Sequence, residues 1–156
     1  MLGVAAGMLT FAACKTEQKI SSEYVGNNFA TECLGEDMAG INTLRVWGKG
    51  KNRAEAIEQA KRNALRDIMF SGVFGGSGSC TVRPLVTEVN AQEKYRDYFN
   101  AFFKEGGAWN KYVTLNEKRT SRMSSKSLSA ENFGVVVVVE TSALRQRLID
   151  DNIIDQ

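Results

Sequence analysis

The chain has 156 residues, of which 43% are hydrophobic and 24% charged, which suits one globular domain and is short for two. Its 20 Lys and Arg residues against 18 Asp and Glu give a formal net charge of +2, which argues against the dense basic face of a nucleic-acid-binding protein. Histidine is absent, so the commonest general base and the commonest zinc ligand are missing. We therefore expect no enzyme, no catalytic residue, no cofactor and no metal site.

An apolar leader precedes Cys14. Residues 2–13 read LGVAAGMLTFAA, carry no charge and are too few to cross a bilayer as a helix, which is typical of a signal-peptide core. Ala12 and Ala13 supply the small side chains that a lipoprotein peptidase accepts before the cysteine. We expect residues 1–14 to be a lipoprotein signal peptide whose cysteine is lipidated, giving an exported outer-membrane lipoprotein held on the membrane by that anchor. A plain secretory signal or a buried N-terminal helix is the alternative.

Export changes the interpretation of the other two cysteines. Cys33 and Cys80 remain as an even pair once Cys14 carries lipid, and both have loop-like neighbours. In an oxidising compartment such a pair predicts a disulfide, and closing a loop of this length would stabilise the fold by roughly 4 kcal/mol. Two buried free thiols are the alternative.

The first part of the predicted domain is a strand followed by a helix. Residues 15–40 are polar and lack periodicity, so we expect a tether there and a single domain over 41–156. Apolar and polar residues alternate over Thr43–Trp47, which predicts a half-buried strand. Asn52 and Glu55 form a capping signature for a helix. The core positions of that helix are Ile57, Ala60, Ala64, Leu65 and Ile68.

The second part predicts one more helix and two paired strands. A Gly/Ser loop over 71–79 ends the first helix, and Pro84 limits residues 81–86 to an edge strand or an extended segment. Asn90 and Glu93 resemble a second helix cap. The aromatic residues of the helix that follows recur at helical spacing and are Tyr95, Tyr98, Phe99, Phe102 and Phe103.

The last elements define the predicted sheet. Residues 112–118 alternate, and five consecutive valines, Val135–Val139, are typical of a strand buried on both faces. We expect these two strands to pair antiparallel around a long tip and Thr141 to begin a closing helix. The order β-α-(β)-α-β-β-α predicts an α+β fold, with a small antiparallel or mixed sheet covered by both central helices.

Two basic clusters are the candidate contacts for an anion or a partner. The turn between the first strand and helix contains Lys49, Lys51 and Arg53, and the predicted hairpin tip contains Lys118, Arg119, Arg122 and Lys126. Glycines before a helix can expose backbone N–H groups to a phosphate, and clustered cations suit anionic lipid headgroups or an acidic glycan. A tight turn and a solvated hairpin tip are the simpler interpretations of the two clusters.

Several of these features resemble one known family. The strand over 43–50, the helix with Ala54, Ala56, Ala60 and Ala64, and the late valine strand resemble the small outer-membrane lipoproteins related to the N-terminal domain of flagellar assembly protein T. The leader also resembles those of lipoproteins from the Bacteroides group. The resemblance implies an envelope-associated, non-catalytic binding or assembly module and supplies no catalytic residue.

These observations predict an interaction or assembly module on the cell envelope, with an envelope protein or a glycan as its partner and no nucleic acid. A binder of a small ligand or glycan that uses the aromatic helix is one alternative. An envelope enzyme that depends on carboxylates is the other, although the acidic pairs in the sequence are only chain neighbours.

Overall fold

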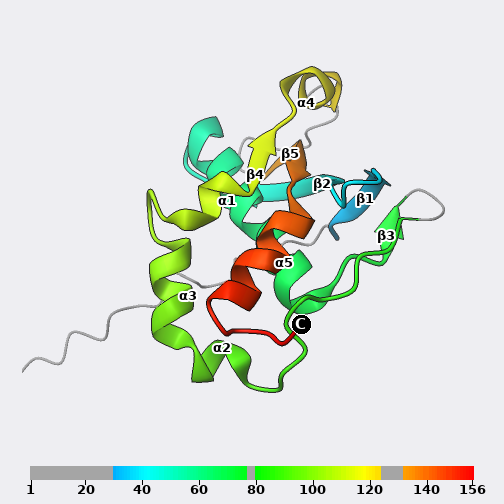
Figure 1. Ribbon diagram of the computed structural model, residues 1–156. Helices are drawn as coiled ribbons and strands as arrows, with labels where there is room; N and C mark the ends of the chain where they lie inside the picture. The colour runs from blue at the N-terminus through cyan, green and yellow to red at the C-terminus, as the bar shows by residue number, and fades with distance from the viewer. Residues whose placement is uncertain (1–29, 77–79, 124–131) are drawn as a thin grey trace, which may run out of the picture.

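The computed structural model describes residues 30–76, 80–123 and 132–156, and these form a five-stranded mixed sheet packed against helices (Figure 1). The predicted α+β class is confirmed. The strand order is β3-β1-β2-β5-β4, and all neighbours are antiparallel except β1 and β3. The strands are β1 (Glu32–Glu36), β2 (Asn42–Lys49), β3 (Gly75–Gly76), β4 (Val113–Leu115) and β5 (Asn132–Val139).

The helical segments connect these strands and cover the core. They are α1 (Arg53–Arg66), the π-helical turn η1 (Asp67–Ser71), α2 (Ala91–Lys94), α3 (Arg96–Phe103), the 3-10 turn η2 (Ala108–Lys111), α4 (Glu117–Met123) and α5 (Thr141–Asp150). One hydrophobic core contains residues from the sheet and from α1, α3 and α5.

The pairing of β2 with β5 forms the middle of the sheet. The two strands are in register along their whole length, from Asn42 opposite Val139 to Lys49 opposite Asn132. Leu44 is fully buried on one face, and Val136 on the other face is 1% exposed. β4 pairs antiparallel with the last residues of β5, as the alternation predicted. A valine run suits this position because its strand is largely enclosed on both faces.

α1 lies very close to β2 because the residues at the contact are small. Asn52 accepts a hydrogen bond from the Glu55 N–H at 3.0 Å, which confirms the predicted cap. A Cβ at Gly48 would lie 2.0 Å from the Ala56 carbonyl oxygen, so only glycine fits beneath the helix. Ala60 is fully buried at the same contact.

The aromatic segment differs from the single helix that its spacing predicted. It is divided into α2 and α3, and Asn90 has a left-handed φ of 62° without a capping hydrogen bond from its side chain. α3 packs on η1 through Phe99, whose ring centroid lies 5.0 Å from that of Phe70. Phe102 stacks on Tyr112 before β4. This helix therefore reaches the core beside the end of α1, and the expectation that it lies across the sheet like α1 is wrong.

Two other segments differ from their predictions. β1 lies in the expected tether, because burial of Cys33 holds this segment against β2. Residues 81–86 agree with the extended alternative that Pro84 left open, since they contain no strand and only Val82 forms a bridge, with Val73. α4 occupies the start of the expected hairpin tip, where Asn116 accepts a hydrogen bond from the Arg119 N–H.

The predicted disulfide is confirmed. Cys33 in β1 is bonded to Cys80, and their Cα atoms lie 5.6 Å apart. The bond joins the sheet to the segment that follows β3. The predicted leader, Cys14 and Lys126 lie outside the described residues.

Candidate functional site

Both predicted basic clusters follow strands that point towards the same end of the sheet. β2 and β4 both run antiparallel to β5; β2 ends opposite Asn132, whereas β4 ends earlier, opposite Val137, and α4 continues beside β5 from there. The first cluster follows β2, and the second follows β4 on α4 (Figure 1). We call this surface the basic end and define it as Lys49, Lys51, Arg53, Lys118 and Arg119. Arg122 lies on the last turn of α4, and Lys126 falls outside the described residues, so neither is included.

α4 is held in place by the strand beside it. The Val136 N–H donates a hydrogen bond to the Thr120 hydroxyl oxygen at 2.9 Å, and the Asn116 N–H donates to the Val136 carbonyl oxygen at 2.8 Å. Thr120 is 2% exposed. The helix thus takes the place that a longer β4 would have occupied, and it directs Lys118 and Arg119 into solvent.

The five cations of the basic end outnumber the acids beside them. All five side chains are exposed, and none forms an ion pair with another residue in the part of the chain that the structure describes. Of the nearby acids, Glu55 accepts hydrogen bonds from the Lys51 N–H and the Asn52 side chain, which commits it to the helix cap. Glu117 is the other exposed acid there.

The turn from β2 to α1 does not offer a cradle for phosphate. A Cβ at Gly50 would lie 2.5 Å from the Ala56 backbone nitrogen, so this glycine, like Gly48, serves close packing. At the start of α1 the Glu55 N–H is bonded to the Asn52 side chain and the Ala56 N–H to the Asn52 carbonyl. Helix packing therefore explains the two glycines, and the side chains of the cations are what this turn presents to an anion.

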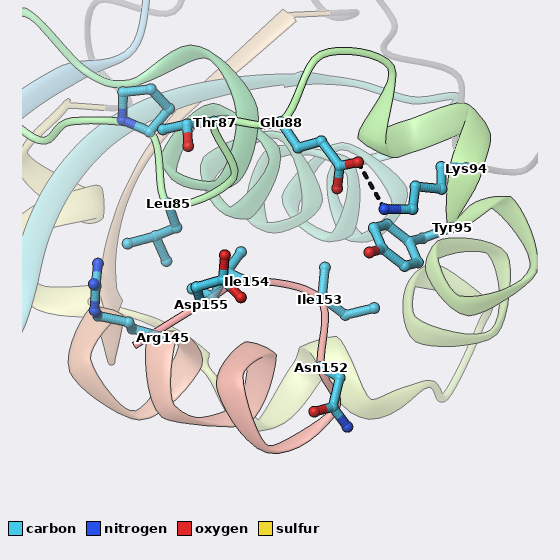
Figure 2. A pocket seen from close by; sticks show the side chains of 11 residues that line it. Leu85, Thr87, Glu88, Lys94, Tyr95, Arg145, Asn152, Ile153, Ile154 and Asp155 are labelled. Atoms are coloured by element: carbon cyan, nitrogen blue, oxygen red, sulfur yellow. Dashed lines mark hydrogen bonds and ion pairs between the residues drawn. The ribbon is translucent and has the colours of Figure 1, made fainter.

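A hollow of about 470 Å³, which no pattern in the sequence indicated, lies between distant segments of the chain (Figure 2). Leu85 lies on one side of the hollow and Tyr95 on the other, with the Glu88–Lys94 ion pair of 2.7 Å above the tyrosine. Polar and apolar groups alternate around it. The remaining lining residues are Pro84, Thr87, Arg145, Asn152, Ile153, Ile154 and Asp155.

The aromatic helix uses its rings for packing. Phe99, Phe102 and Phe103 are between 1% and 4% exposed, so they do not form the open aromatic face that a glycan requires. A groove of about 390 Å³ runs beside α3, where the Arg66 guanidinium lies 4.8 Å from the centre of the Phe103 ring. Burial and the neighbouring Arg62 charge lower the pKa of Arg66 to about 10.

The other titratable groups with shifted pKa values take part in structural contacts. Burial raises the pKa of Asp67, although a hydrogen bond from the Thr31 hydroxyl and the charge of Arg66 both act to lower it. Burial also raises the pKa of Tyr98, which donates a hydrogen bond of 2.7 Å to Asp151. Each of these contacts joins segments that are distant in the chain, which is the arrangement expected of groups that hold a fold together.

Several classes of site find no support in the described residues. They contain no group of three or more Cys, Asp or Glu side chains arranged to hold a metal ion. None of the helices within 30–76, 80–123 and 132–156 is long and apolar enough to cross a membrane. Comparisons with family models, with curated proteins and with solved structures found no match to this chain.

Proposed function

We propose that this chain is an exported lipoprotein whose domain is a non-catalytic interaction module, binding an anionic partner through the basic end. The observation that carries the proposal is that two basic clusters, separate in the sequence, each follow one of two strands that run in the same direction. An excess of positive charge towards one end of the domain attracts partners of opposite charge and accelerates their association.

The disulfide supports the exported part of the proposal. Structural disulfides are typical of oxidising compartments and rare in reducing ones. Cys33 is fully buried and Cys80 is 7% exposed, so their bond belongs to the folded core. The third cysteine, Cys14, follows the apolar leader, where a lipid anchor is attached in exported lipoproteins.

The contacts made by the perturbed groups support a non-catalytic role. A catalytic acid or base needs an accessible group beside a cleft. Asp67 is buried and bonded to Thr31. Tyr98 is half-buried and lines a surface hollow, but its hydroxyl is bonded to Asp151, and both contacts fasten one segment of the chain to another. The resemblance to envelope lipoproteins favours the same role.

Photo-crosslinking in the producing cell tests this function. A photoreactive residue replacing Lys51 or Lys118 is expected to capture the same partner, because the two positions belong to one surface. The matched control replaces Lys104, an exposed lysine after α3. Products that are absent at positions 51 and 118, or identical at position 104, would contradict the proposal.

A further inference from the structure

Building on this proposed function, we infer that the partner of the basic end is the anionic headgroup surface of the membrane that holds the lipid anchor. In this arrangement the domain stands on the bilayer with the strands of its sheet pointing towards the headgroups. Lys49, Lys51 and Arg53 follow the strand on one flank of β5, and Lys118 and Arg119 follow the strand on its other flank.

The path of the chain supports this orientation. Glu32 at the start of β1 pairs with Arg45, and Glu36 at its end pairs with Asn42, so β1 runs away from the basic end. The chain therefore enters the domain from the direction of the basic end. The 16 residue steps between Cys14 and Ala30 span at most about 55 Å, which keeps the domain close to any surface that holds Cys14.

The charges at the opposite end of the sheet favour the same orientation. Exposed Glu36 and Asp37 lie at the turn where β2 begins, and exposed Glu140 follows the last residue of β5. Lys111, just before β4, is a cation at that end. An anionic bilayer attracts the basic end and repels the acidic one, and both effects act mainly within about 8 Å of the charged surface.

The geometry of the basic end suits a broad surface better than a single bound anion. Its five cations extend from the end of β2, the linker to α1, the first turn of α1 and the start of α4. The Glu55 N–H is taken by the Asn52 side chain, and Gly48 and Gly50 pack against the helix backbone, so the turn is not a glycine cradle that fixes one phosphate. Separate, flexible cations can each meet a different headgroup. An acidic glycan has similar charge, but the anchor keeps the membrane permanently within reach.

The test measures which lysines the membrane protects. The protein, purified with its native modifications, is reconstituted on vesicles of phosphatidylcholine alone or with added phosphatidylglycerol. It is then treated with a membrane-impermeant amine reagent, and modification at each lysine is measured by mass spectrometry. Lys49, Lys51 and Lys118 are expected to react roughly fivefold more slowly on the anionic vesicles, and high salt should abolish the difference. Lys104 and Lys111 are exposed internal controls and should react equally on both.

Matched variants identify the charges responsible. Lys118→Gln with Arg119→Gln should reduce the protection of Lys49 and Lys51, because fewer cations then hold the end on the bilayer. Lys104→Gln with Lys111→Gln makes the same change in net charge and should leave that protection intact. Equal protection of all five lysines, or no protection on anionic vesicles, would overturn the inference.

The lipid on Cys14, measured in the same sample, and the crosslinks formed in the cell separate this inference from the proposed function on which it rests. If Cys14 carries lipid but the basic end is unprotected, the orientation on the membrane is wrong and the anchored module still stands. If positions 51 and 118 crosslink to a protein or glycan, the headgroup surface is likewise overturned as the partner. If Cys14 carries no lipid, the proposed function itself fails.

Discussion

Gly48 shows how the absence of one side chain positions a helix. This residue lies in β2 beneath α1, where a Cβ would be 2.0 Å from the Ala56 carbonyl oxygen and 2.6 Å from the Ala60 nitrogen. Both atoms belong to the helix backbone, so no rotation of a side chain can relieve the contact. The close approach of helix and sheet, and the position of the basic turn beside it, depend on glycine here.

Gly48→Ala is therefore expected to destabilise the protein by roughly 2–3 kcal/mol, because the helix must move away from the strand. Chemical denaturation of the wild type and the variant measures this. Gly35→Ala is the matched control, since a Cβ there meets nothing within 4 Å and its backbone is unstrained. Equal stability of the two variants would show that α1 is not packed as described.

Asp67 makes the stability of the protein depend on pH, and the direction of its pKa shift determines the sign of that dependence. Burial raises its pKa in the folded protein above the 3.8 of an ordinary aspartate. Between those two values the folded chain binds more protons than the unfolded chain, so its contribution to stability falls as the pH rises. Above the raised pKa the loss is complete and the contribution stays constant.

Asp67→Asn should remove this dependence, because the amide cannot ionise and its oxygen can still accept from Thr31. The stability of the variant relative to the wild type should then increase as the pH rises from about 4 through the raised pKa. Urea unfolding across this pH range measures the difference, with exposed Asp155→Asn as the control. If the wild type gained stability relative to Asp67→Asn over that range, the direction of the shift would be wrong.

Among the elements, β1 depends most on a covalent bond. It is a short strand, has an irregularity between Cys33 and Gly35, and pairs on its outer side with only the two residues of β3. Its disulfide to Cys80 therefore constrains a segment with few other pairings.

Reduction should lower the free energy of unfolding by about 4 kcal/mol, as chain entropy predicts for cysteines that are 47 residues apart. Denaturation midpoints with and without reductant measure the effect, and Cys33→Ala with Cys80→Ala should match the reduced protein. Cys14→Ser is the control and should leave the midpoint unchanged. A reduced protein as stable as the oxidised one would contradict this role of the bond.

The elements with strong local patterns were predictable from the sequence. β2, the start of α1 and the valine strand β5 each carry their own signal, in alternation, capping or a run of branched residues. β1 and α4 do not. The segment of β1 has no alternation and is held by pairing with β2, whereas α4 follows an alternating stretch that resembles a longer strand. Tertiary contacts determine the secondary structure of such segments.

For the whole molecule, the exposed charges differ between the two ends of the sheet, with an excess of cations where β2 ends and acidic residues where β2 begins. The sequence identified the basic residues of both clusters, but that both follow strands pointing towards the same end of the sheet depends on strand order and direction, which no local pattern contains. The hollow beside Tyr95 was unpredictable for the same reason, since its walls come from segments far apart in the chain. The aromatic stripe was a candidate ligand site in the sequence; in the structure its phenylalanines are core, whereas Tyr95 and Tyr98 are half-buried.

The intact mass of the protein purified from the membranes of the producing cell tests the central claim most directly. The anchored-module account predicts a chain that begins at Cys14, carries a diacylglyceryl group there, and is lighter by two hydrogens because Cys33 and Cys80 are bonded. The Cys14→Ser variant should lack the lipid. A mass that retains residues 1–13, or that shows Cys14 unmodified, would contradict the account.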